Sequence, residues 1–147
     1  MSVVVRAMAA PPQAVLDVLA DGWSYAAWVV GTSRIRAVER TWPAPGARIE
    51  HSVGVWPAVI DDETLVLAWD RTRGIELQAR GWPAGEARIA IEVRPRGDGC
   101  VVRISEDATD GPGRLVPRPL RSLAIGARNR ETLRRLEALA ARPGTTS

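Results

Sequence analysis

The sequence predicts an α+β domain: a seven-stranded, curved antiparallel sheet wrapped around a long C-terminal helix, with two short helices between the first two strands. Three observations lead to this fold class. Residues 34–110 form six segments rich in Val, Ile, Leu, Thr and Trp, separated by short breaks of Gly, Pro and Asp. These breaks are too short for helical crossovers, so consecutive strands must pair antiparallel. After them, residues 119–141 are strong helix formers with no internal proline.

The N-terminal segment supplies the first strand and the two short helices. Residues 3–8 are expected to form the strand, and the prolines at 11 and 12 open a helix with apolar residues along one side. Residues 23–29 are expected to form the second short helix, which the Gly-Thr-Ser sequence at 31–33 ends. The six later strands are expected at 34–42, 47–56, 59–69, 74–82, 86–95 and 100–109, joined as hairpins.

Length and composition fit one domain. The chain has 147 residues, of which 46% are hydrophobic and 25% charged, enough for one substantial core. We expect a single domain over 1–142 and a disordered tail at 143–147. All 20 basic residues are Arg, and six Trp stand beside one Tyr and no Phe. This skew fits a coding bias, and it also fits rigid indoles that line a cavity.

Cysteine and histidine usage limits the chemistry. Cys100 is the only cysteine and His51 the only histidine, so neither an intrachain disulfide nor a His/Cys metal cluster can form. We therefore predict no metal and no cofactor. The apolar residues at 3–10 are interrupted by Arg6 and stopped by Pro11, unlike a signal peptide. No apolar run reaches the ~20 residues of a membrane span, and we expect a reduced, cytoplasmic setting.

The basic charge is concentrated in the predicted C-terminal helix. Arg121, Arg128, Arg135 and Arg142 recur every seven residues and so lie along one stripe. We interpret this stripe as a solvated helix face; an acidic partner is the alternative, and no specific nucleic-acid partner is predicted. Leucine and alanine make another side of the helix's first half apolar. We expect the early helices or a second subunit to cover it, which leaves a homodimer open.

The inward face of this helix places the predicted pocket. Its first half presents Ser122, Gly126 and Asn129, which are small or polar and leave space, whereas Leu133 and Leu136 in the second half can pack tightly on a sheet. We therefore predict a ligand pocket beside the first half. Its expected lining is Trp28, Ile49, His51, Val53, Val55, Trp56, Trp69, Leu77, Ala79, Ile89, Ile91, Ile104, Glu106, Ser122, Gly126 and Asn129.

Three polar residues are expected to converge on that pocket. Strand alternation points His51 inward among apolar residues and carries Glu106 inward as well, unless a β-bulge near 105–107 reverses it. With Asn129 they could bind a ligand, or His51 and Glu106 could transfer protons. The alternative is that each satisfies a local backbone or Arg group and touches no ligand. No phosphate loop or nucleophile elbow is present, so these two remain the only catalytic candidates.

The order of elements carries a resemblance to a known family. Its carriers are the segment 11–19 after the first strand, the strand opening at 46–49, the turn at 96–100 and the closing run 120–139. With them, the chain resembles the polyketide cyclase/dehydrase-like branch of the START-like (SRPBCC) superfamily, which has the helix-grip fold. Residues 54–57 and 111–119 resemble a subgroup of small actinobacterial-type proteins.

The resemblance implies a deep cavity between the sheet and the long helix that holds lipids, sterols or polyketides. Some members of the family are aromatase/cyclases, and many only bind or carry. We therefore expect binding of a small hydrophobic or amphipathic molecule, lipid- or polyketide-like. One alternative is a polyketide cyclase/dehydratase-like enzyme that uses His51 and Glu106. Another is an interaction protein that uses the Arg stripe.

Overall fold

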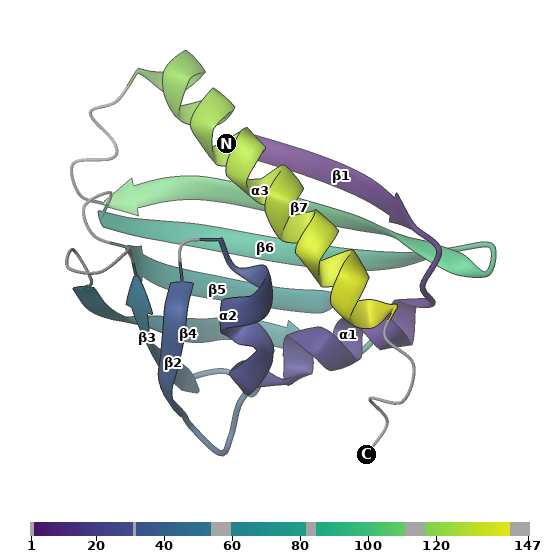
Figure 1. Cartoon of the computed structure of the whole chain (residues 1–147), viewed down its shortest axis with the longest axis horizontal. Coiled ribbons are helices and arrows are strands. Elements are labelled where there is room, and N and C mark those ends of the chain that lie inside the picture. The colour runs from purple at the N-terminus through teal and green to yellow at the C-terminus, as the bar shows by residue number, and fades with distance from the viewer. Residues whose placement is uncertain (1, 31, 54–59, 82–84, 111–116, 142–147) are drawn as a thin grey trace.

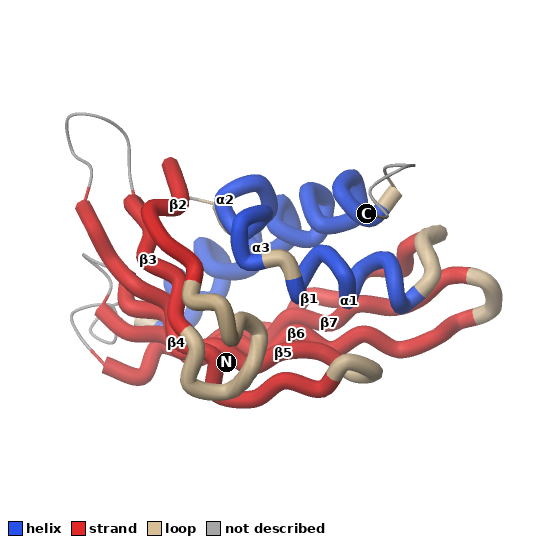
Figure 2. Tube along the Cα trace, turned by 90° about the horizontal axis from the view of Figure 1, so that it is seen from below, coloured by secondary structure: helices blue, strands red, loops and turns tan. Residues whose placement is uncertain are grey.

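The computed structural model describes residues 2–30, 32–53, 60–81, 85–110 and 117–141. A seven-stranded antiparallel sheet curls around the helices, which all lie on its inner side (Figures 1 and 2). The elements are β1 (Ser2–Met8), α1 (Pro12–Ala20), a short 3-10 helix (Gly22–Ser24), α2 (Tyr25–Trp28), β2 (Thr32–Val38), β3 (Arg48–Val53), β4 (Ile60–Asp70), β5 (Gly74–Gly81), β6 (Gly85–Arg96), β7 (Gly99–Asp110) and α3 (Arg118–Ala140). The predicted fold class is confirmed.

The strand order β1-β7-β6-β5-β4-β3-β2 is a meander of consecutive hairpins to which the first strand is added at the far edge. β1 pairs with β7 from Ser2 opposite Glu106 to Met8 opposite Cys100 without a shift of register. α3 crosses the inner side of β1 and β7 diagonally, with α1 and α2 packed beside it (Figure 1). The sheet therefore surrounds the helices with a single, continuous inner face.

Most predicted boundaries lie within one or two residues of the described ones, but two predicted elements differ more clearly. The expected helix at 23–29 is divided into the short 3-10 helix and a single turn, α2, because the Asp21 side chain accepts a hydrogen bond from the Trp23 backbone N–H at 3.1 Å and starts a new turn. The strand expected at 34–42 ends at Val38. Trp42 instead turns inward, is 8% exposed, and donates from Nε1 to the Leu19 carbonyl at 3.2 Å.

The tightest part of the core lies under the second half of α3. Leu133 and Leu136 are fully buried there, together with Val15 of α1. In the first half, Leu120 and Leu123 are 61% and 69% exposed. The early helices therefore do not cover that apolar side, and the expectation that they would is wrong. That a second subunit covers it stays a prediction. Within the described ranges, no helix is both long enough and apolar enough to cross a membrane.

We predict that α3 stabilises the fold mainly through its buried leucines. Leu133→Ala should lower the free energy of unfolding by about 2–5 kcal/mol, because it removes buried apolar surface and leaves a cavity. Leu123→Ala, on the exposed side of the same helix, should change it by less than about 0.5 kcal/mol. Urea unfolding followed by circular dichroism measures both values. Equal effects of the two substitutions would contradict this picture of the core.

Two glycines should respond in opposite ways to a methyl group. A Cβ at Gly126 would lie 3.7 Å from Ser2 Oγ and 3.9 Å from Arg130 Nη2, which is ordinary contact. Gly126→Ala should therefore stabilise the protein by about 0.5–1 kcal/mol, through the higher helix propensity of Ala. Gly74 has φ +146°, and its Cβ would lie 1.9 Å from the Ile91 carbonyl oxygen. Gly74→Ala should lower the thermal midpoint, whereas Gly126→Ala should raise it.

Candidate functional site

The burial of the inner face changes along its length. On β6, Ile91 and Val93 are 1% exposed. Ala87 and Ile89 lie on the same side of this strand, closer to its start, and are only half-buried. On α3, Ile125 is also half-buried, whereas the leucines of the second half are fully buried. Apolar surface of the inner face is therefore accessible toward the first half of α3.

Glu106 is a buried carboxylate next to α3. The β7 register is continuous on both sides from Cys100 to Glu106, so this residue shares the inner face with Val102 and Ile104. Glu106 is 4% exposed, and its carboxylate accepts hydrogen bonds from Arg128 Nη2 and, at 3.3 Å, from Asn129 Nδ2. Such partners offset the cost of removing a charge from water.

Arg128 therefore differs from the solvated helix face that the Arg spacing predicted. Its guanidinium forms an ion pair with buried Glu106, although its own side chain remains 41% exposed. Arg135 pairs with Glu131 one turn earlier, at 3.3 Å. Arg142 lies outside the described residues, and the side chain of Arg121 is not described. The two described members of the stripe are thus engaged with acidic partners of this chain.

A second buried polar cluster joins α2 to β3 and β4. Thr64 Oγ1 lies 2.9 Å from the Tyr25 hydroxyl and 2.9 Å from His51 Nε2. The rings of Tyr25 and His51 pack with centroids 5.3 Å apart, and Trp28 packs edge-on against Tyr25 at 5.2 Å. We call Tyr25, Trp28, His51 and Thr64 the α2 cluster. All four are nearly inaccessible to solvent.

Burial sets the protonation states in the α2 cluster. Desolvation lowers the pKa of His51 below its ordinary value, with the charge of Asp62 opposing and that of Arg36 adding to the shift. The imidazole is therefore neutral at pH 7. Desolvation raises the pKa of Tyr25 to about 12, Thr64 opposes this, and the negative charge of Glu106 adds to it. The phenol therefore keeps its proton at neutral pH.

The structure joins two of the three polar residues that were expected to converge. Glu106 and Asn129 are hydrogen-bonded, but His51 has other partners. β6, β5 and β4 separate β7 from β3, which is roughly 19 Å along the sheet at ~4.8 Å per strand. The negative charge of Glu106 does raise the pKa of Tyr25, whose ring packs against His51.

The other predicted lining residues, apart from Trp69, fall into three groups. Buried on the inner side are Trp28, Ile49, Leu77, Ile91 and Ile104, while Ala79 and Ile89 are half-buried there. Gly126 is buried where α3 faces the start of β1. Val53 and Ser122 lie in β3 and α3, but their side chains are not described, and Val55 and Trp56 lie outside the described residues.

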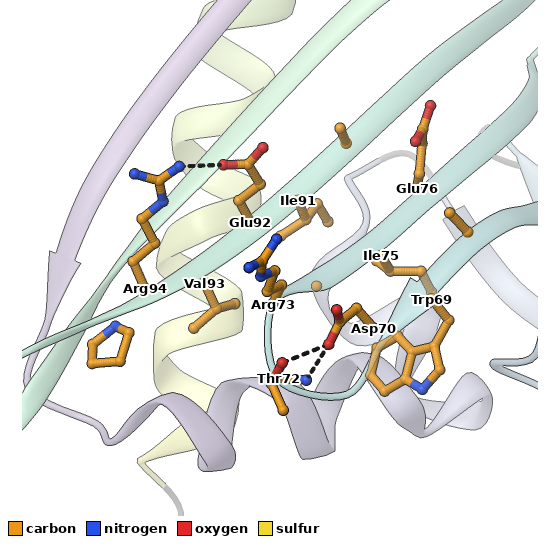
Figure 3. A pocket seen from close by; sticks show the side chains of 14 residues that line it. Trp69, Asp70, Thr72, Arg73, Ile75, Glu76, Ile91, Glu92, Val93 and Arg94 are labelled. Atoms are coloured by element: carbon orange, nitrogen blue, oxygen red, sulfur yellow. Dashed lines mark hydrogen bonds and ion pairs between the residues drawn. The ribbon is translucent and has the colours of Figure 1, made fainter.

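Trp69 borders a hollow of about 560 Å³ beside the β4–β5 turn (Figure 3). This hollow also contains Arg73, Glu92 and Arg94, and the last two form an ion pair at 3.6 Å. Glu92 and Arg94 alternate with the buried Val93, so they point to the outer face of β6. The hollow is therefore distinct from the pocket predicted between the sheet and α3. Trp69 borders this hollow, although it lies opposite the buried Ile75 and packs against the core.

The family model described as "Polyketide cyclase / dehydrase and lipid transport" matches residues 2–141. The chain belongs to this family. The resemblance noted from the element order is thereby confirmed. A search of curated proteins found no match. Among the described residues, no group of three or more His, Cys, Asp or Glu side chains is placed to hold a metal ion.

Solved structures share the helix-grip fold of this family member. The crystal structure of Ara h 8.0201 has a TM-score of 0.71 at 12% identity, and the match covers 94% of this chain and 95% of that one. The di-domain ARO/CYC StfQ from the steffimycin biosynthetic pathway has a TM-score of 0.72 at 12% identity, covering 94% of this chain and 49% of that one. A protein from Nitrosomonas europaea has a TM-score of 0.71 at 16% identity, covering 93% and 91%. At these identities the likeness shows the fold.

Sequence reasoning missed Tyr25 and Thr64 as members of the polar cluster. Tyr25 is the only tyrosine and stands in a short apolar stretch, where its hydroxyl needs a partner once buried. Thr64 lies two residues before the buried Val66 and so shares its side of β4. Alternation could thus have placed Thr64 inward. The pairing with Tyr25 could not be predicted, because it depends on how α2 packs against the sheet.

We predict that stability depends on pH through His51. Its folded-state pKa lies below the ordinary value of 6.5, so the unfolded chain takes up a proton first as the pH falls. Stability should therefore be greatest above pH 7 and fall below pH 6.5, by at most about 1.4 kcal/mol per pH unit. His51→Gln should abolish this slope between pH 7 and 5.5, because the chain has no other histidine. Urea unfolding at several pH values measures it, and identical slopes in both proteins would refute the assignment.

Proposed function

We propose that the protein binds one small hydrophobic or amphipathic molecule, lipid- or polyketide-like, between the inner face of the sheet and the first half of α3. The observation that carries this proposal is the half-buried apolar surface of Ala87, Ile89 and Ile125 on that face. Burying apolar surface is favourable by about 25 cal/mol per Å². A ligand that covers these side chains buries their accessible surface, and this contributes favourable free energy to the binding of an apolar molecule.

The polar groups at this end of α3 favour an uncharged ligand. The carboxylate of Glu106 is already neutralised by Arg128 and hydrogen-bonded by Asn129. The site therefore offers no free ionic partner from this group, and a charged ligand would lose hydration without recovering it. The amide oxygen and the second N–H of Asn129 supply polar contacts that orient a mostly apolar molecule.

Binding is better supported than catalysis. A cyclase or dehydratase that used His51 and Glu106 together would need both groups within hydrogen-bond reach of one substrate region. The two residues lie four strands apart in the sheet order, and each is engaged with other partners. The alternative of an Arg-stripe interaction protein is also weakened, because Arg128 and Arg135 pair with Glu106 and Glu131 of the same chain.

A neutral fluorescent probe, N-phenyl-1-naphthylamine, tests this location. The wild-type protein should bind one molecule and enhance its emission. Ile89→Trp should weaken binding at least tenfold, because the indole occupies the inner side of β6. Ala90→Trp places the same indole on the opposite side of the strand, so its affinity should stay within twofold of wild type.

Folding of both variants is checked by urea unfolding. If Ile89→Trp does not fold, Ile125→Trp on α3 takes its place, with exposed Leu123→Trp as the matched control. Absence of any probe binding to the wild-type protein would overturn the proposal. So would equal binding by the inner and outer variants, since the probe would then sit elsewhere.

A further inference from the structure

Two buried donor or acceptor atoms lack partners in the part of the chain that the structure describes. They are Trp28 Nε1 and His51 Nδ1, each on a residue that is 3% exposed. Both rings pack against Tyr25, with centroids 5.2 and 5.3 Å away. Buried polar atoms are nearly always hydrogen-bonded in native proteins, so two exceptions around one ring indicate a missing partner.

The hydrogen bonds of the α2 cluster determine which kind of partner is missing. Tyr25 and Thr64 each carry one hydroxyl hydrogen, and the neutral His51 ring carries one N–H. If the Tyr25 hydroxyl donates to Thr64 Oγ1, Thr64 can donate to His51 Nε2, and both hydroxyl hydrogens are satisfied. His51 Nε2 is then an acceptor. Its single hydrogen must therefore be on Nδ1.

The other tautomer leaves a buried hydroxyl hydrogen unpaired. If His51 Nε2 carried the hydrogen, it would donate to Thr64 Oγ1. Either Thr64 or Tyr25 would then have no acceptor for its own hydrogen among the hydrogen bonds that the described residues form. The arrangement in which both hydroxyl hydrogens have acceptors therefore makes His51 Nδ1 a donor. Trp28 Nε1 can only donate, so both unpartnered atoms are donors.

The charges nearby favour a neutral acceptor over an anion. Asp62 lies opposite His51 in the β3–β4 register, and its negative charge is the largest charge effect on that ring. Glu106 has the same role for Tyr25. Arg36 and Arg128 oppose these two negative charges with smaller effects, so a carboxylate or phosphate brought beside the rings would still meet a net repulsion. An uncharged carbonyl oxygen would accept the hydrogen bonds without that repulsion.

We propose that Trp28 Nε1–H and His51 Nδ1–H recognise a ketone- or ester-type carbonyl oxygen on the ligand. This inference rests on the proposed function, because the carbonyl belongs to the molecule bound between sheet and helices. Neither nitrogen is accessible to water in this structure, so binding displaces the Trp28 ring on α2. α2 is a single turn of four residues, and its displacement exchanges two unpaired donors for two hydrogen bonds.

The tautomer is tested on the ligand-free, full-length protein. His51 is the only histidine, so a long-range ¹H–¹⁵N spectrum of the imidazole contains one residue. We expect a protonated Nδ1 and an unprotonated Nε2. Thr64→Val removes the relay and should shift the population toward Nε2–H. A wild-type ring protonated on Nε2 would overturn the proposal.

The carbonyl is tested with two naphthalenes of nearly the same shape, 2-acetylnaphthalene and 2-isopropenylnaphthalene, in competition with N-phenyl-1-naphthylamine. The wild-type protein should bind the ketone about tenfold more tightly. The ketone should also shift the Trp28 indole and His51 Nδ1–H signals, whereas the hydrocarbon should not. Trp28→Phe should reduce the preference several-fold. Trp23→Phe, at a 62% exposed position, should leave it unchanged.

The outcomes separate this inference from the proposed function. Equal affinities for the two naphthalenes, with both N–H signals unmoved, would overturn the inference and leave ligand binding intact. No binding of either naphthalene or of the fluorescent probe would overturn both. A preserved ketone preference in Trp28→Phe, with an unmoved Nδ1–H signal, would place the carbonyl elsewhere and overturn the inference.

Discussion

The fold depends on covering one apolar face of a curved sheet with helices, of which α3 is the longest. α3 covers its part unevenly, because Leu133 and Leu136 close the second half while Gly126 and Asn129 occupy the first. Burial under the leucines supplies the stability, since buried apolar area is the main favourable contribution to folding. The less tightly closed first half can then differ in residue type without loss of the fold. The proposed site and the core thus share one helix and lie in different halves of it.

The two polar clusters are consequences of that division. Glu106 can be buried on β7 because Arg128 and Asn129 extend to it from the first half of α3. The α2 cluster forms where the short α2 presents aromatic rings to β3 and β4. Thr64 contacts both the Tyr25 hydroxyl and His51 Nε2, while His51 Nδ1 and Trp28 Nε1 have no partner among the described residues. The inner wall therefore combines a neutralised charge pair with two unpartnered ring nitrogens.

The periodicity of apolar residues predicted the arrangement of strands and helices. It could not predict which side chains pair with one another. Alternation over β3 and β7 placed His51 and Glu106 on one face because a pleated strand leaves no other choice when the register is continuous. The seven-residue Arg spacing placed Arg128 and Arg135 on one side of α3, but it could not reveal that Arg128 pairs with Glu106. The same limit applies to Tyr25 and Thr64, whose contact spans 39 residues. Such contacts depend on helix placement, which local sequence does not encode.

The protonation states bear on the choice between binding and catalysis. A general base works best when its pKa is near the operating pH and its basic nitrogen is free. Burial lowers the pKa of His51, and Nε2 is engaged with Thr64. In the tautomer proposed above, Nδ1–H can donate a hydrogen bond but cannot take up a proton from a substrate. A histidine held in this way suits recognition of an acceptor better than proton transfer.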